Sequence, residues 1–427
     1  MEGCDGNLDG SPGDLTFRRY RRFGESGAKL IWFEACAVAE EGRANPRRLW
    51  IHRASVSALK RLLAVCRQAH RERYGSLDGL VTVLQLTHSG RYASPKPLVA
   101  YPHPVLDRWP TVGPVSAPPR ATPPQVTGDE HLEALEDKFA EASAWAREIG
   151  FDGVDLKMTH GYLLSELLSA RARPGSYGGD LSGRATFAVR TLQKIRQRAG
   201  KDFLLADRLG VYDGVPYCTS DGKAEGVPRD FPRPYQFGSG VRAENPLHMD
   251  LSEPLRFIGH LRDAGLGLLN VSMGIPYANP HLSRPYEKPN EGVYETPEHP
   301  LLGVARHFKA QAVIQEAYPD LAVVGAGYSW LQHFLIHAAA ANLMLMLRRI
   351  KFVGLGRAAL AYPWLAREAL EKGEINPLQT CKTLSFCTYL MRSKNHPLGQ
   401  FPAGCPPFDK DPYGQIVKEA RHAARKN

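Results

Sequence analysis

Seven short apolar segments, each followed by an amphipathic helical pattern, most limit the fold that this chain can adopt. The predicted strands are AKLIWFEA (28–35), LVTVLQL (80–86), GFDGVDLKM (150–158), DFLLADRLG (202–210), LGLLNVSMG (266–274), LAVVGAG (321–327) and IKFVGLGR (350–357). Strict alternation of strand and helix favours a parallel sheet, and this many units favours closure into a barrel. We therefore expect an α/β protein built as a (β/α)8 TIM barrel.

The first strand of such a barrel is missing from the sequence pattern. LTFRRYRRFGES (15–26) reads as the first helix, and only MEGCDGNLDGSPGD, which has loop composition, precedes it. We therefore expect seven core strands, with Met1 and Glu2 near the barrel mouth. A barrel short of one strand has two unpaired edges, which favour aggregation. The sequence thus predicts either a start upstream of Met1 or a poorly soluble product.

Composition excludes several classes of protein. The net charge of +10 is dispersed, and basic clusters such as Arg18–Arg22 lie on helical segments, which indicates solvated helix faces and no nucleic-acid partner. Seven scattered cysteines, an odd number, are typical of reduced thiols in a cytoplasmic protein. The longest apolar run, 334–347, contains His337 and Asn342 and is too short and polar to span a membrane.

The segments that follow the predicted strands are long and rich in Gly and Pro, at 88–128, 211–250 and 275–298. In a (β/α)8 barrel these loops form the face that carries the active site. The segments that follow the helices are short. The sequence therefore predicts a ligand site at the carboxyl ends of the strands.

Polar side chains stand near those strand ends. Gln85, Lys157 and Arg208 each lie in an otherwise apolar strand. Convergent polar groups at this end of a barrel indicate a flat polar ligand. The alternative is an internal layer of ion pairs in which Asp155 contacts Lys157 or Arg208.

The last two strands end in glycine-rich turns, VVGAGYS (323–329) and VGLGR (353–357). Backbone N–H groups after the seventh and eighth strands form the common phosphate site of these barrels. Two such turns in the last two units, the second carrying Arg357, predict a phosphate-binding site.

Five blocks follow one another along the chain: GAKLIWFEACAVAEEGR (27–43), LQLTHSGRYASP (84–95), GFDGVDLKMTHGYLLSELLSARARPGSYGGDLSGR (150–184), VVGAGYS and VGLGRAALAYP (353–363). With these blocks the sequence resembles the old yellow enzyme family of FMN-dependent NAD(P)H:flavin oxidoreductases over nearly its whole length. The resemblance implies bound FMN, NADH or NADPH as the reductant, and a small-molecule acceptor such as an activated alkene.

The resemblance also implies cofactor-binding residues. Gln85 matches the glutamine that hydrogen-bonds the flavin pyrimidine edge, and Arg208 matches the arginine near flavin N1 and O2, where a cation stabilises the anionic reduced ring. Ala35 matches the small residue that lets the chain pass close to the ring. The phosphate-binding loops match Ala326, Gly327, Gly356 and Arg357.

Three residues match the family's catalytic positions. Tyr162 matches the tyrosine that gives a proton to the substrate carbon opposite the hydride. Lys157 and His160 stand where the family has His-x-x-His or His-x-x-Asn, the pair that holds the substrate carbonyl. Lysine carries three donors and normally a full charge. We expect the pair to bind an anionic or strongly polar oxygen, such as a carboxylate or a developing enolate.

The alternative for Lys157 is neutralisation by a nearby carboxylate, so that the lysine only shapes the pocket. Glu2, Glu34 and Asp155 are the candidate partners. Glu2 is itself a departure, because the family often has Thr or Cys there.

Larger relatives carry a four-cysteine iron–sulfur site after the barrel. In CKTLSFC, Cys381 and Cys387 keep the outer spacing, Leu384 occupies the middle position, and Cys405 follows later. Three thiolates cannot make the four-cysteine set. We therefore expect no iron–sulfur cluster and no other metal site. We expect residues 1–375 to form the FMN barrel and residues 376–427 to form an extension packed on it.

Two further functional alternatives stay open. One is oxidation of an amine or similar donor, as in the dehydrogenase branch of the family. The other is a barrel that has lost FMN and acts as a binding protein. A homo-oligomer is also left open. His88 and Tyr92 are interpreted as either loop packing or substrate contacts, Tyr177 as structural, and Cys36 as packing.

Overall fold

The computed structural model describes residues 2–287, 293–345 and 350–425, and within them the expected seven core strands are confirmed. They form one parallel sheet in the order β1 (Leu30–Ala37), β2 (Val81–Thr87), β5 (Gly153–Met158), β6 (Leu204–Gly210), β9 (Leu268–Ser272), β10 (Ala322–Gly325) and β11 (Phe352–Val353). Strand order follows chain order, as in a TIM barrel. In the described part of the chain, β1 and β11 do not pair with each other, so the curved sheet remains open between them.

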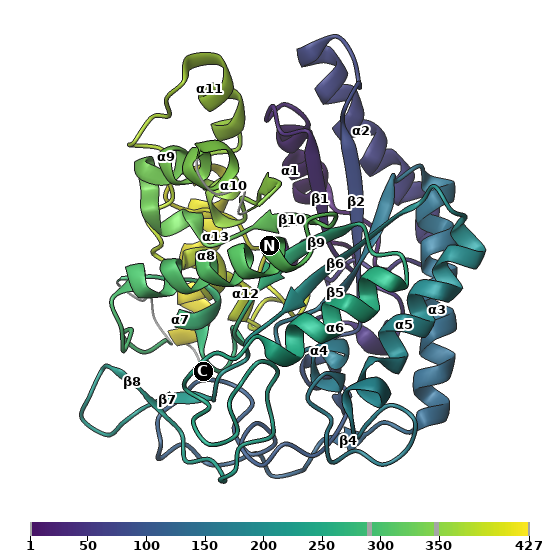
Figure 1. The fold of residues 1–427 in the computed structure, drawn as a ribbon. Helices are drawn as coiled ribbons and strands as arrows, with labels where there is room; N and C mark the ends of the chain where they lie inside the picture. The colour runs from purple at the N-terminus through teal and green to yellow at the C-terminus, as the bar shows by residue number, and fades with distance from the viewer. Residues whose placement is uncertain (1, 288–292, 346–349, 426–427) are drawn as a thin grey trace.

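Helices cover the outside of the sheet (Figure 1). The helices that follow strands, or precede β1, are α1 (Asp14–Gly24), α2 (Val56–Tyr74), α3 (Asp129–Ile149), α5 (Leu181–Ala199), α6 (Ser252–Asp263), α8 (Pro300–Ala317) and α11 (Leu365–Lys372). No helix in the described ranges is long and apolar enough to cross a membrane.

One expected helix is broken. SWLQHFLIHAAAANL, after β10, reads as a single helical pattern, yet the structure has η4 (Tyr328–Phe334), α9 (Leu335–Ala340) and the π-helical η5 (Ala341–Leu345). Gln332 adopts φ +50° and interrupts the helix. Side chains of this type rarely adopt that conformation, and the apolar periodicity of the segment does not reveal it.

The long loops contain short elements that sequence periodicity does not reveal. They are η1 (Glu40–Gly42), η2 (Arg53–Ser55), η3 (Gly90–Tyr92), β3 (Leu98–Val99), β4 (Gln125–Val126), α4 (Leu163–Leu167), β7 (Tyr217–Thr219), β8 (Gly226–Pro228), α7 (Pro280–Ser283) and α10 (Arg357–Ala361). Elements of two to five residues are too short to show a 2.0 or 3.6 period.

The two faces of the sheet have different neighbours. Val83, Ala206, Leu268 and Val324 form an apolar layer inside the barrel, with Trp32 beside it. The alternate residues of the strands, such as Leu84, Leu156 and Leu205, belong to the main core with the apolar sides of the helices. Alternation places successive side chains on opposite faces, so Gln85, Lys157 and Arg208 continue the inner face toward the strand ends.

The C-terminal segment packs near the start of the chain. It contains α12 (Phe386–Arg392) and α13 (Lys410–Arg425), whose buried residues form a separate apolar cluster against Leu15 of α1. Arg18 and Arg22 donate to the Asp409 carboxylate at 2.7 and 2.6 Å. The boundary expected at residue 375 stays a prediction.

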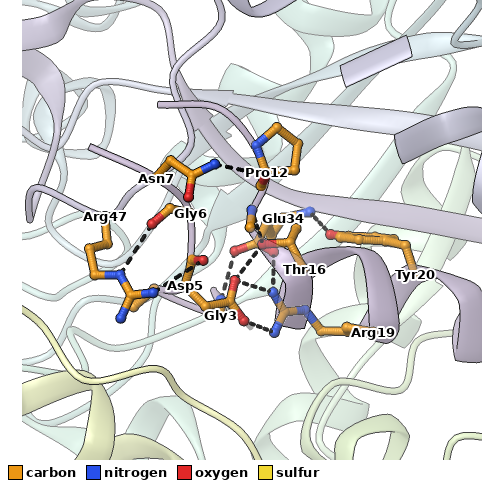
Figure 2. Close-up of polar contacts among 12 residues, drawn as sticks. Gly3, Asp5, Gly6, Asn7, Pro12, Thr16, Arg19, Tyr20, Glu34 and Arg47 are labelled. Carbon is orange, nitrogen blue, oxygen red and sulfur yellow. Dashed lines mark hydrogen bonds and ion pairs between the residues drawn. The ribbon is translucent and has the colours of Figure 1, made fainter. Parts of the chain in front are cut away.

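The N-terminal segment is tied to α1 and β1 by buried polar contacts (Figure 2). Arg19 of α1 donates to Asp5 at 2.8 Å and to Glu34 at 2.9 Å. The Gly3 N–H donates to Glu34 at 2.6 Å. A Cβ on Gly3 would overlap the Arg19 guanidinium, so any larger residue at position 3 would have to displace that group from Asp5 and Glu34. These contacts fix the backbone next to Glu2.

Candidate active site

Three predicted polar residues meet inside the barrel because their strands are in register. Gln85 of β2 is paired with Asp155 of β5, and Lys157 of β5 is paired with Arg208 of β6. Arg208 is in turn paired with Asn270 of β9. Residues paired across parallel strands point to the same face. The structure thus brings Gln85, Lys157 and Arg208 together, as expected.

Asp155 organises the floor of this site. Its carboxylate accepts hydrogen bonds from the Trp32 indole N–H at 2.6 Å, the Arg208 backbone N–H at 2.7 Å, and the Gln85 amide. Burial raises the pKa of Asp155 to about 6, against these hydrogen bonds. Across the described residues, Asp155 makes no ion pair with Lys157 or Arg208. The ion-pair layer proposed as an alternative is therefore wrong, and the role of Trp32 was missed.

Lys157 pairs instead with Glu2. Its Nζ lies 2.6 Å from Oε1 of Glu2, while Arg48 Nη2 contacts Oε2 of the same carboxylate. Arg48 also donates to the Tyr162 hydroxyl at 3.0 Å and to the Ser89 hydroxyl at 2.7 Å. Burial, then the nearby cations Arg48 and Arg208, hold the pKa of Lys157 well below its usual value. A carboxylate at this point offsets that cost.

The Arg48 contact was not predicted. Arg48 lies in NPRRLW, a loop segment in which two successive arginines read as surface charge. Its side chain is only 2% exposed. No periodicity or motif in the sequence indicates that this loop folds back over the strand ends.

Tyr162 and His160 lie beside Lys157. The Tyr162 ring lies under the Lys157 ammonium, 3.9 Å from it, and its hydroxyl is 3.3 Å from that of Tyr277. Burial raises the pKa of Tyr162 above its usual value. His160 has a backbone φ of +70°, and burial with the cations Arg208 and Lys157 lowers its pKa well below the usual value. Both residues therefore stay uncharged near neutral pH.

Three buried nitrogens near the strand ends have no hydrogen-bond partner among the residues that the structure describes. They are Nε of Arg208, Nδ1 of His307 on α8, and Nη1 of Arg357. Burial, together with the charges of Arg306, Arg208 and Arg357, lowers the pKa of His307 to about 4, which places His307 near these arginines. Buried polar groups are normally paired. Arg208 and Arg357 can donate to a ligand, whereas Nδ1 of His307 can only accept, because its Nε2–H donates to the Leu282 carbonyl at 3.1 Å. This row of polar groups fits an elongated polar ligand with anionic groups, as FMN is.

The phosphate end of that row is strongly cationic. Burial, together with the charges of Arg392 and Arg357, lowers the pKa of Arg284 to about 9. In the described ranges, none of these three guanidinium groups has a carboxylate partner. Arg284 and Arg392 were missed, because they lie in a loop and in the extension, far apart in sequence.

The glycine-rich turns have the geometry that this position requires. Gly327 adopts φ +95°, a left-handed conformation that favours glycine, and the Gln311 amide holds the adjacent Ala326 carbonyl at 2.9 Å. A Cβ at Gly356 would meet no atom within 4 Å, so space remains beside its backbone. Arg357 donates to the Pro285 carbonyl at 3.1 Å and keeps its other nitrogen free. Ala35 lies buried in β1. The residues present therefore fit the FMN implied by the resemblance.

The four positions of the cysteine motif line one small cavity of about 30 Å³. Cys381, Leu384, Cys387 and Cys405 all contribute to it, together with Arg357. The spacing therefore gathers three thiols and one leucine at a single place.

Three other residues have identifiable surroundings. Tyr92 stacks on Tyr277, with ring centroids 4.0 Å apart, next to Tyr162. The Tyr177 hydroxyl donates to Glu136 of α3 at 2.8 Å, which is a structural contact. His88 is buried, and its Nδ1 accepts from the Gly90 N–H at 3.2 Å.

Comparison with known proteins identifies related chains and a family. A profile of the NADH:flavin oxidoreductase / NADH oxidase family matches residues 9–221. The NADH oxidase of Thermoanaerobacter brockii is 26% identical over 218 residues, and the dimethylamine dehydrogenase of a Hyphomicrobium species is 25% identical over 270. These alignments cover 48% and 60% of this chain but only 29% and 28% of those proteins.

Among solved structures, the old yellow enzyme homologue from Zymomonas mobilis is similar with a TM-score of 0.59 and 18% identity, covering 88% of each chain. This similarity supports the TIM-barrel fold. The chain spans less than a third of the length of the two curated relatives.

Proposed function

Because the chain belongs to the NADH:flavin oxidoreductase / NADH oxidase family, which includes the old yellow enzymes, we propose that it is an FMN-dependent oxidoreductase. It takes hydride from NADH or NADPH and passes it to an activated alkene or another small acceptor. With an alkene as the acceptor, the overall reaction converts NAD(P)H, one proton and the alkene into NAD(P)⁺ and the saturated product. When bound, FMN would relay the hydride between the two substrates.

One observation carries the proposal. Gln85, Lys157 and Arg208 converge from three neighbouring strands, and the buried Arg208 Nε lacks a partner. A cation fixed at this point favours negative charge on the ring that it faces. Gln85 and Arg208 would hold the ring, while Ala326, Gly327, Gly356 and Arg357 would hold the phosphate.

The acceptor would bind on the Lys157 side of the site. Lys157 and His160 would orient an acceptor oxygen, which polarises the adjacent carbon–carbon double bond. The raised pKa keeps the Tyr162 hydroxyl protonated at neutral pH, so that it can give its proton to the alkene carbon.

The test begins with the absorbance spectrum of the purified protein, which should show flavin bands. Anaerobic mixing with NADH and with NADPH should then bleach those bands, and alkene acceptors should restore them. A protein without flavin bands that also fails to take up added FMN would support the binding-protein alternative and refute the proposal. Bleaching by an amine in place of NAD(P)H would favour the dehydrogenase alternative.

A further inference from the structure

The Glu2 carboxylate lies in an anion-binding site formed by buried cationic side chains. It is held between Lys157 Nζ, 2.6 Å from Oε1, and Arg48 Nη2, which contacts Oε2. The side chains of Arg48, Lys157 and Glu2 are 2%, 3% and 11% exposed. Two cations buried against one carboxylate form a charge-assisted contact of the strong kind. The site thus recognises a carboxylate by both of its oxygens.

We propose that Arg48 and Lys157 form the binding site for a substrate carboxylate, and that Glu2 stands in for that group in the free chain. This inference rests on the proposed function and names the class of its acceptor: a carboxylic acid whose double bond is conjugated with the carboxylate.

The charge balance favours an added anion. Arg48 and Lys157 are two cations facing one carboxylate, and Arg208 stands beside Lys157 in register. Asp155, another carboxylate on the same face, already accepts hydrogen bonds from Trp32, Gln85 and the Arg208 backbone. Without Glu2 the cluster would hold buried positive charge with no partner, which is costly. An incoming carboxylate would remove that cost.

Glu2 can leave without releasing the segment that carries it. The neighbouring backbone is fixed independently, by the Gly3 N–H to Glu34 and by Asp5 to Arg19 (Figure 2). Withdrawal of the Glu2 carboxylate therefore leaves these backbone and side-chain contacts of Gly3 and Asp5 intact. The tethered carboxylate competes with the substrate at a high effective concentration.

Arg48 also links the carboxylate position to the proton donor. Its Nη2 contacts both Glu2 Oε2 and the Tyr162 hydroxyl, the latter at 3.0 Å. A carboxylate in the place of Glu2 would thus lie next to the hydroxyl that supplies the proton. The stacked rings of Tyr92 and Tyr277 flank Tyr162 and offer apolar surface for the carbon part of an acid.

The experiment measures binding without turnover. Oxidised protein is titrated with 3-phenylpropanoate and with neutral 3-phenylpropanamide by calorimetry. Glu2→Ala should bind the carboxylate at least tenfold more tightly than the wild type, with little change for the amide. Glu2→Ala/Arg48→Met should lose that gain, and Glu2→Ala/Arg48→Lys should keep part of it. Arg53→Met, at an arginine that is 72% exposed, is the control and should bind as the wild type does.

If Glu2→Ala gains no carboxylate affinity, or binds acid and amide alike, the cluster is a structural ion pair and the inference is wrong. The gain in Glu2→Ala and the part kept by Glu2→Ala/Arg48→Lys both need folded protein. For Glu2→Ala/Arg48→Met, unchanged affinity for the amide shows that the loss is specific and not a result of misfolding. Flavin bleaching by NAD(P)H, measured separately, tests the proposed function. Normal bleaching without carboxylate selectivity would reject only the inference.

Discussion

Lys157 and Arg208 are register partners on β5 and β6, so two buried cations stand side by side inside the barrel. Within the described residues, Glu2 pairs with Lys157, whereas the Arg208 side chain has no ion-pair partner. Burial lowers the pKa of Arg208, which reflects the cost of an uncompensated charge. The two cations therefore divide the site, with the flavin expected over Arg208 and the acceptor over Lys157.

Replacing Arg208 should weaken FMN binding. A charge-assisted hydrogen bond contributes about 1.5–3 kcal/mol, so Arg208→Met should raise the dissociation constant of FMN roughly ten- to hundredfold and lower the reduction potential. Fluorescence titration of apoprotein with FMN measures the first effect. Arg262→Met, on the exposed end of α6, is the matched control. Unchanged affinity and potential in Arg208→Met would disprove the assignment of Arg208 to the ring.

Arg19 should be essential for stability. Its guanidinium neutralises both Asp5 and Glu34, and its side chain is 6% exposed. Arg19→Met leaves two buried carboxylates uncompensated and should cost about 3–5 kcal/mol in the free energy of unfolding. Arg21→Met on the same helix removes an exposed pair with Glu25 and should cost less than about 0.5 kcal/mol. Urea unfolding followed by circular dichroism compares them, and equal losses would contradict the prediction.

His88 should make the protein sensitive to acid. Burial lowers the pKa of His88 to about 4, below its usual value of 6.5. Between these pH values the unfolded chain binds a proton that the folded chain does not. Stability is therefore complete above pH 6.5 and falls as the pH drops toward 4, by about 3 kcal/mol for a gap of this size.

His88→Gln keeps an acceptor for the Gly90 N–H but does not titrate. The free energy of unfolding of this variant should fall by about 2–3 kcal/mol less than that of the wild type between pH 7 and pH 4. Chemical unfolding at a series of pH values supplies both curves. Parallel curves for the two proteins would mean that His88 titrates normally in the fold.

The strands and their inward polar residues could be predicted because period-2 alternation is a local signal. Val83 and Gln85, or Asp155 and Lys157, show it within a few residues, and parallel register then brings them together. Arg48, Tyr277 and Arg284 could not be predicted. Each lies in a loop whose path depends on contacts with distant segments, and none sits in a periodic pattern.

The partner of Lys157 illustrates the same limit. Three carboxylates were candidates from sequence, and only the fold separates them: Glu2 reaches Lys157, Glu34 bonds Arg19 and Gly3, and Asp155 bonds Trp32. The sequence shows which residues are charged. Which carboxylate pairs with Lys157 depends on where the folded N-terminal segment places Glu2.

The cysteine cavity should hold no iron–sulfur cluster in the wild type. Leu384 occupies the fourth position around the cavity lined by Cys381, Cys387 and Cys405. Iron and acid-labile sulfide should be far below one cluster per chain after anaerobic reconstitution. Leu384→Cys completes the four-thiol set and should gain both, together with the broad visible absorbance of a cluster. A stoichiometric cluster in the wild type would overturn the prediction.

Lys157 provides the most direct test of the acceptor side. Its ammonium lies between the Glu2 carboxylate and the Tyr162 ring, beside its register partner Arg208, where the flavin is expected. Lys157→Met removes the donor but keeps the apolar stem, and Lys157→His restores the usual family residue. Both variants should be reduced by NAD(P)H at rates near that of the wild type. The methionine variant should reoxidise with the acceptor roughly tenfold or more slowly, because a charged contact of about 1.5–3 kcal/mol is lost. The histidine variant should recover turnover with neutral carbonyl acceptors better than with acids.

Stopped-flow absorbance separates the two half-reactions. Intact acceptor turnover in Lys157→Met, or loss of FMN from it, would show that Lys157 does not hold the acceptor.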